Sequence, residues 1–198
     1  WIGDQNGDGC DELLIAQEPF TAYENNAEDF LNRVELYFGG DEISEEPDII
    51  FGPYQELEGI GVSLCFLGDL TGDGYYNFAI RSRLYEENED LPYMSKLYIY
   101  SGGEVIDTIP DFVLEDRIIS DKFDRPCDIN GDGLNDLLVF RNTDPRELQI
   151  YYGGEDFDLE VDDVITNEDA GSWFGNAKLL SGFDLNGDGC DEIYVRTW

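Results

Sequence analysis

A nine-residue pattern occurs four times in this chain and constrains its fold more than any other feature. It runs Asp-x-Asn/Thr-Gly-Asp-Gly, then two variable residues, then an acid or amide, at residues 4–12, 69–77, 128–136 and 184–192. We call these copies the first to fourth acidic loops and number their positions 1 to 9. Their first aspartates are 65, 59 and 56 residues apart. A second motif, aliphatic-Tyr-x-Gly-Gly, recurs in the same phase at 36–40, 99–103 and 150–154. Two motifs in one order and at one period indicate an array of structural repeats.

Each repeat is predicted to contain four short strands. Strand 1 leads into the acidic loop, as at Val62–Leu67 and Lys178–Phe183. Strand 2 leaves it, at Leu13–Ala16, Phe78–Arg81, Leu137–Phe140 and Ile193–Arg196. Strand 3 ends at the Gly-Gly pair, and strand 4 follows at Ile49–Phe51, Phe112–Leu114 and Val161–Ile165. Four antiparallel strands in such a repeat match the size of a propeller blade.

We therefore predict an all-β fold, a single β-propeller segment over residues 1–198. Its repeats lie at approximately 1–58, 59–118 and 119–170, with a partial repeat at 171–198. This gives three complete periods plus partial blades, with the acidic loop between strands 1 and 2. Both ends of such a segment would present open sheet edges. Either further blades in the parent protein or head-to-tail self-association into a ring or filament would cover them.

The acidic loops have the ligand pattern of calcium, which takes six to eight oxygen atoms arranged around a sharp turn. Side chains at positions 1, 3, 5 and 9 and the backbone carbonyl at position 7 are the predicted ligands. An EF-hand glutamate at position 12 is absent, because Ile15, Ile80, Val139 and Val195 stand there. The predicted ligands, for up to four Ca²⁺ sites, are Asp4, Asn6, Asp8, Cys10, Glu12, Asp69, Thr71, Asp73, Tyr75, Asn77, Asp128, Asn130, Asp132, Leu134, Asp136, Asp184, Asn186, Asp188, Cys190 and Glu192. The second loop has only two carboxylates, so we expect the weakest site there.

Composition restricts the partners. The formal net charge is −35 with only 11 basic residues, which argues against nucleic acid and against anionic membrane surfaces. No apolar run reaches the roughly 18 residues that span a bilayer, so membrane insertion is not expected. Histidine is absent, which excludes histidine-based metal sites and triads. The four cysteines fit either disulfides in an oxidising compartment or buried free thiols, and the spacing does not choose between them.

The loops, together with Trp173-Phe174-Gly175 before the fourth of them, resemble the FG-GAP repeats of integrin α-subunit propellers and related bacterial surface proteins. The resemblance covers essentially the whole chain. Gly61-Val62 and Phe123-Asp124 replace Phe-Gly before the second and third loops, and the closing Gly-Ala-Pro element is missing. The resemblance implies an extracellular or cell-surface scaffold for adhesion or binding.

Ligands are expected at the end of the blades opposite calcium, where strands 2 and 3 are joined. The connections Gln17–Asn32 and Ser82–Ser95 are long and aromatic. Candidate ligand-binding residues are Phe20, Tyr23, Tyr85, Tyr93, Arg81 and Arg196. The alternative is that the aromatics pack on the blades and the arginines neutralise surplus acids.

The leading functional hypothesis is a calcium-stabilised extracellular scaffold for binding, adhesion or assembly, without catalysis and with an unknown protein or glycan ligand. A lectin-like propeller is one alternative. Part of a propeller polysaccharide lyase or hydrolase is the other.

Overall fold

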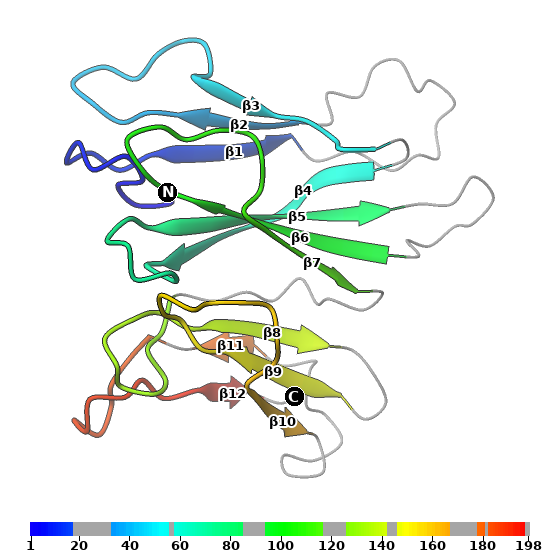
Figure 1. The fold of residues 1–198 in the computed structure, drawn as a ribbon. Helices are drawn as coiled ribbons and strands as arrows, with labels where there is room; N and C mark the ends of the chain where they lie inside the picture. Colours follow the sequence, from blue (N-terminus) through cyan, green and yellow to red (C-terminus); the bar gives the residue numbers. More distant parts are fainter. Residues whose placement is uncertain are drawn as a thin grey trace. The chain divides into compact units, whose positions relative to one another are not determined.

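The computed structural model describes residues 1–17, 33–55, 58–84, 94–116, 126–141, 146–166, 178–180 and 182–196. The chain forms two compact units. Unit one comprises Trp1–Leu64 with Phe78–Arg117, and unit two comprises Cys65–Asn77 with Ile118–Trp198. Every regular element among the described residues is a β-strand, which confirms the all-β prediction (Figure 1).

The strands of unit one form two sheets. The first has the order β1-β2-β3, from β1 (Leu13–Gln17), β2 (Arg33–Tyr37) and β3 (Ile49–Phe51). The second has the order β4-β5-β6-β7, from β4 (Glu58–Gly68), β5 (Asn77–Leu84), β6 (Met94–Ser101) and β7 (Phe112–Asp116), with the acidic-loop end of the β4–β5 hairpin counted in unit two. This second sheet has the four strands in sequence order that we predict for a blade.

Alternating apolar residues build the core of unit one. Val34 and Leu36 of β2 are fully buried, and Val34 is paired with Phe51 of β3. The Phe51 ring meets Phe78 and Tyr100 edge to face, with centroids 5.8 and 4.8 Å apart. Such aromatic pairs contribute beyond their buried area, so they connect the two sheets of this unit.

One close approach in unit one requires glycine. Gly61 of β4 has φ +86°, and a Cβ there would lie 2.8 Å from Val34 Cγ2 and 2.9 Å from the Ala16 Cβ. Because L side chains rarely adopt this φ and both contacts are too short, only glycine lets β4 pass this close to β1 and β2.

Unit two contains a three-stranded and a two-stranded sheet. The first has the order β10-β9-β8, from β8 (Leu137–Arg141), β9 (Glu147–Tyr151) and β10 (Asp163–Thr166). The second pairs β11 (Lys178–Leu180) with β12 (Tyr194–Arg196). A buried core cluster of unit two comprises Cys127, Leu138, Phe140, Leu148 and Ile150. The predicted strands 2, 3 and 4 around the third loop are thus confirmed, while before that loop the described residues show an isolated bridge between Cys127 and Asp136.

A repeated aspartate that the sequence analysis did not single out opens each strand 4. Its Oδ2 accepts a hydrogen bond from the amide ten residues earlier, just before the Gly-Gly pair. Its own amide donates to the carbonyl of the aliphatic residue that begins the aliphatic-Tyr-x-Gly-Gly motif, twelve residues earlier. The aspartates are Asp48, Asp111 and Asp162, bonded to the Phe38, Ser101 and Tyr152 amides at 2.8, 2.8 and 2.7 Å. Their amides donate to Leu36, Ile99 and Ile150 at 2.9, 2.9 and 3.0 Å. The constant ten-residue spacing was the signal available in the sequence.

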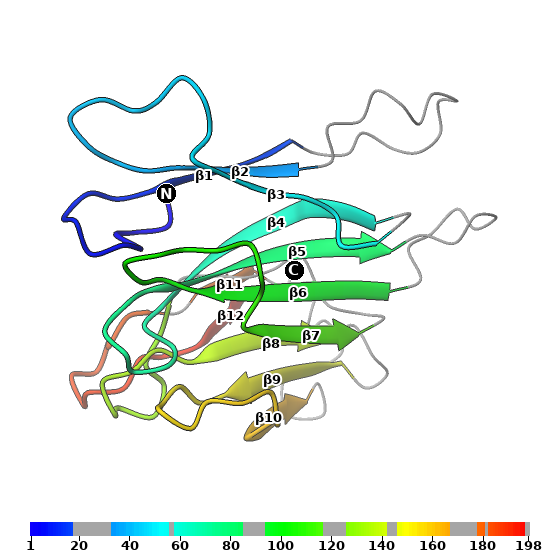
Figure 2. The ribbon, with the colours of Figure 1, turned by 45° about the horizontal axis from the view of Figure 1, so that its top comes forward.

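Acidic loops and Gly-Gly turns gather at one end of the strands, as alternating strand direction predicts. Figure 2 shows this in unit one for the loop before β1 and the turns after β2 and β6. In unit two the same holds for the third and fourth acidic loops and the turn after β9. Closure of a ring and the number of blades remain predictions.

Candidate metal centres

The aspartate at position 1 organises every acidic loop by accepting backbone hydrogen bonds. Its Oδ1 accepts from the amide at position 4, at 2.7, 2.8, 2.7 and 2.6 Å in the first to fourth loops. Its Oδ2 accepts from the amide at position 6, at 2.9, 3.0, 2.7 and 3.0 Å. The ring of amides favours the charged carboxylate. Accordingly, the amides of Gly189 and Gly187 lower the pKa of Asp184.

Glycines at positions 4 and 6 permit this ring. Their φ values lie between 74° and 94° in all four loops, a region that L side chains rarely adopt. With this backbone, the position 1 carboxylate faces two amides that a regular turn would not bring together. The spacing of the two glycines is therefore a requirement of the loop itself.

Positions 3 and 5 are also tied to the turn. The asparagine Oδ1 at position 3 accepts from the position 5 amide at 2.8, 2.9 and 2.8 Å in the first, third and fourth loops. The position 5 aspartate accepts from the position 7 amide in all four loops at 2.8 to 3.0 Å. In the second loop, the buried Thr71 Oγ1 has no hydrogen-bond partner.

The side chain at position 9 accepts a hydrogen bond from the amide at position 2 in every loop. Asn77 accepts from Leu70 at 2.8 Å, Asp136 from Ile129 at 2.7 Å, and Glu192 from Leu185 at 2.6 Å. Glu12 accepts in the same way from Gln5. Position 9 therefore closes the loop whether or not it also binds an ion.

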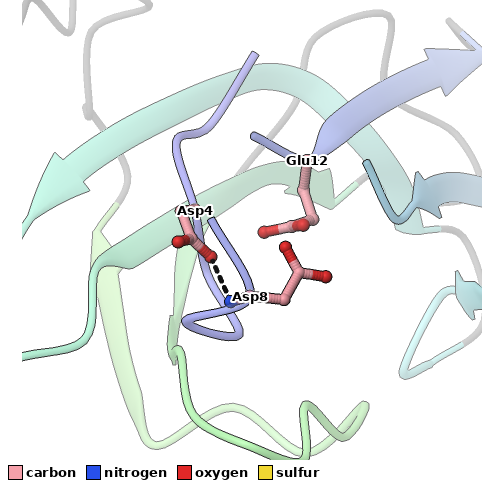
Figure 3. Close-up of side chains that lie close together, drawn as sticks. All are labelled: Asp4, Asp8 and Glu12. Atoms are coloured by element: carbon pink, nitrogen blue, oxygen red, sulfur yellow. Dashed lines mark hydrogen bonds between the residues drawn. The ribbon is translucent and has the colours of Figure 1, made fainter. Parts of the chain in front are cut away.

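Three carboxylates of the first loop converge. Asp4, Asp8 and Glu12 place one oxygen each within 4.8 Å of one another, and Figure 3 shows the Glu12 and Asp8 carboxylates facing each other. Glu12 is fully buried, and its Oε1 has no hydrogen bond of good geometry. Burial raises the pKa of Glu12, the Gln5 and Gly39 amides partly offset this, and the charges of Asp4 and Asp8 add to it. An oxygen cluster of this kind, buried and short of donors, suits a hard cation.

The fourth loop repeats the convergence at a more accessible place. Asp184, Asp188 and Glu192 also lie within 4.8 Å of one another, with both aspartates exposed and Glu192 half-buried. Here both Glu192 oxygens have donors, because Oε1 accepts from Asn186 Nδ2 at 2.6 Å. The first and fourth loops thus present the same three carboxylates, but only in the fourth loop does each glutamate oxygen accept a hydrogen bond of good geometry.

The second and third loops do not form such a group among the described residues. In the third loop, Asp136 is 3% exposed, and its second carboxylate oxygen accepts a hydrogen bond from the Gly153 amide at 2.9 Å. Burial raises the pKa of this carboxyl. Asp136 and Asn77 are one methylene shorter than Glu12 and Glu192, so the longer residue is what brings a third carboxylate to the aspartate pair.

Of the candidate ligand-binding residues predicted at the end of the blades opposite the acidic loops, only Arg81 has a side chain that the structure describes. Phe20, Tyr23, Tyr85 and Tyr93 lie outside the described residues, as does the side chain of Arg196 in β12. Arg81 is 4% exposed, and its Nη2 donates to Ser95 Oγ at 3.1 Å. Ligand binding on this face stays a prediction.

The four cysteines are not paired with one another; Cys65 and Cys127 are buried, and Cys10 and Cys190 are half-buried in their loops. The structure thus shows no disulfide among the four, although the sequence left that alternative open. No helix in the described part of the chain has the length and apolar character to cross a membrane.

Comparisons with known proteins give one modest likeness. No protein-family model matches the chain. Over 149 residues the chain is 28% identical to integrin alpha-5 of Xenopus laevis. The match covers 69% of this chain, which spans only 14% of that protein. This similarity to an integrin α-subunit is consistent with the resemblance of the acidic loops to FG-GAP repeats.

Proposed function

We propose that this chain is a calcium-stabilised β-propeller segment that serves as an extracellular scaffold for binding, adhesion or assembly. One observation carries the calcium assignment. The fully buried Glu12, whose Oε1 has no hydrogen bond of good geometry, places a carboxylate oxygen within 4.8 Å of oxygens of Asp4 and Asp8. Three negative charges in one half-buried turn repel each other, and a divalent cation with oxygen ligands relieves that repulsion.

Calcium fits this donor set better than other metals. The loops offer carboxylate, amide and carbonyl oxygens, which suit hard cations, and neither thiolate nor imidazole is required. Calcium accepts irregular coordination, whereas magnesium demands an octahedron and loses its water reluctantly. Because the loops form only in the folded chain, the free energy of binding would stabilise the fold directly.

The scaffold role rests on the repeats and on the comparison. The similarity to integrin alpha-5 supports an extracellular role in adhesion or binding. The repeated acids are engaged in the turns themselves, which favours a structural role for the ion over catalysis. The ligand of the scaffold is left open by this reasoning.

Calcium titration by calorimetry, with thermal melts in calcium, magnesium and chelator, tests the proposal. At a free calcium concentration 100 times Kd, each site adds about 2.7 kcal/mol. For a chain of this size that raises Tm by about 5–10 °C per site. We expect calcium to bind and to raise Tm clearly more than magnesium.

Two variants connect the effect to the loops. Asp8→Asn combined with Asp188→Asn should remove the two sites whose acids converge, and the calcium-induced rise in Tm should fall. Glu45→Gln removes an exposed acid outside the loops and should change nothing. Absence of heat and of any Tm shift in the unmodified chain would show that the loops are metal-free turns.

A further inference from the structure

Consecutive acidic loops of unit two are hydrogen-bonded to each other through the residue at position 8. Asn135 of the third loop accepts from the Asp69 amide at 3.0 Å through Oδ1, and its own amide donates to the Asp69 carbonyl at 3.0 Å. Asp191 of the fourth loop does the same to Asp128, with Oδ2 2.9 Å from the Asp128 amide and its amide 2.6 Å from the Asp128 carbonyl. We call each such pair a docking contact.

Close packing accompanies each docking contact. The side chain at position 7 covers the position 4 glycine of the preceding loop. A Cβ on Gly72 would lie 3.2 Å from Leu134 Cδ1, and one on Gly131 would lie 2.9 Å from Cys190 Sγ. The Gly154 amide also donates to the Leu70 carbonyl at 2.9 Å. The third loop and its Gly-Gly turn therefore seat on the second loop at several points.

The docked residue is the one that organises the preceding loop. Asp69 and Asp128 occupy position 1, whose carboxylate gathers the amides of positions 4 and 6. One hydrogen bond donated by its amide and another accepted by its carbonyl fix both peptide groups that flank this residue's Cα. Its carboxylate is thereby oriented from outside its own loop.

The docking residue adjoins the metal-binding residues of its own loop. Asp191 immediately precedes Glu192, which converges with Asp184 and Asp188. An ion held by these three acids would restrict the backbone at residues 188–192, and with it the position of the Asp191 side chain. Order imposed on one loop thus reaches the position 1 aspartate of the loop before it.

We infer that Asn135 and Asp191 are positioning residues that couple calcium binding in neighbouring acidic loops. This inference rests on the proposed calcium function. Calcium in the fourth loop raises the affinity of the third loop, and calcium in the third raises that of the second. By thermodynamic linkage each effect is reciprocal. The chemistry requires a short side chain with an oxygen acceptor, which both asparagine and aspartate provide.

The test uses the full chain and a calcium titration followed by NMR, with the glycine amides at positions 4 and 6 of each loop as site-specific reporters. Asp191→Ala removes the acceptor and Asp191→Asn keeps it. Asn135→Ala removes the other acceptor without changing the charge. Asp11→Ala is the matched control, since Asp11 holds position 8 of the first loop, is exposed, and forms no side-chain hydrogen bond to the described residues.

We expect Asp191→Ala to weaken calcium binding at the third loop by roughly two- to tenfold, the worth of one hydrogen bond. Asn135→Ala should weaken the second loop by a similar factor. Asp191→Asn should leave the third loop close to the unmodified chain. In the metal-free protein, hydrogen exchange at the Asp128 amide should speed up in Asp191→Ala, and exchange at Asp69 in Asn135→Ala. Asp11→Ala should alter neither the second nor the third loop.

Two outcomes would overturn the inference in distinguishable ways. If the unmodified chain binds calcium but Asp191→Ala and Asn135→Ala change only their own loops, the coupling is wrong and the calcium function stands. If the unmodified chain binds no calcium, both fail together.

Discussion

Replacing Glu12 with glutamine tests whether its buried carboxylate is held in place at an energetic cost that calcium removes. Two unit charges at most 4.8 Å apart repel by at least about 3 kcal/mol at an effective dielectric constant of about 20. Solvent around the exposed Asp8 and salt reduce this repulsion, so we take about 2 kcal/mol as the net relief from neutralising Glu12. Glutamine has the same shape, can still accept from the Gln5 amide, and presents an NH₂ group to Asp4 and Asp8.

The expected result has opposite signs in two solutions. In chelator, Glu12→Gln should raise Tm by about 4–8 °C, since about 2–4 °C corresponds to 1 kcal/mol for a chain of this size. In calcium, the loss of a charged ligand should weaken the first site at least tenfold, about 1.4 kcal/mol. The calcium-induced rise in Tm should therefore shrink by about 3–6 °C. Differential scanning calorimetry with and without calcium measures both.

Glu192→Gln is the matched control. Its two oxygens accept from the Leu185 amide and from Asn186 Nδ2, both at 2.6 Å. Glutamine would turn an NH₂ group toward one of these donors, so Tm in chelator should fall slightly. If Glu12→Gln lowers Tm in chelator as Glu192→Gln does, the Glu12 carboxylate is an ordinary hydrogen-bond acceptor and the repulsion argument is refuted.

Three further predictions concern a glycine in β4, a buried tyrosine in β6 and the length of the side chain at position 9. Gly61→Ala should cost about 2–4 kcal/mol in urea unfolding, from its positive φ and its short Cβ contacts; Gly52→Ala, where a Cβ would meet no atom within 4 Å, should cost far less. Burial and the hydrogen bond to Glu58 raise the pKa of Tyr98, so stability is fully present below the unfolded value of about 10 and falls as pH rises above it. Tyr98→Phe should flatten Tm between pH 9 and 11 in chelator, and an unchanged slope would contradict this. Asp136→Glu should tighten calcium binding at the third loop and Glu12→Asp should weaken it at the first, as site-resolved titration by NMR would show; unchanged affinities would contradict the role of side-chain length.

The strands were predictable from sequence because the repeat supplies the same signal several times. Acidic loops and Gly-Gly pairs bound each strand on both sides, so β5, β8, β3 and β7 lie where the pattern put them. The hydrogen bonds that satisfy the position 9 side chains were less predictable from the sequence. That both Asp136 oxygens are hydrogen-bonded, whereas Glu12 Oε1 has no hydrogen bond of good geometry, depends on contacts between segments that the motif does not contain.

Apart from the glycines that permit the turn, the residues of the acidic loops serve two tasks. Positions 1, 3, 5 and 9 carry the oxygens that can face an ion, while in the third and fourth loops positions 7 and 8 face the preceding loop. Position 1 takes part in both, since Asp128 organises its own loop and docks with Asp191. An ion that fixed the carboxylates would therefore also fix the contact between repeats, as we propose above. In a chain with a net charge of −35, a cation bound at this junction would stabilise the packing of one repeat on the next as well as the turn that holds it.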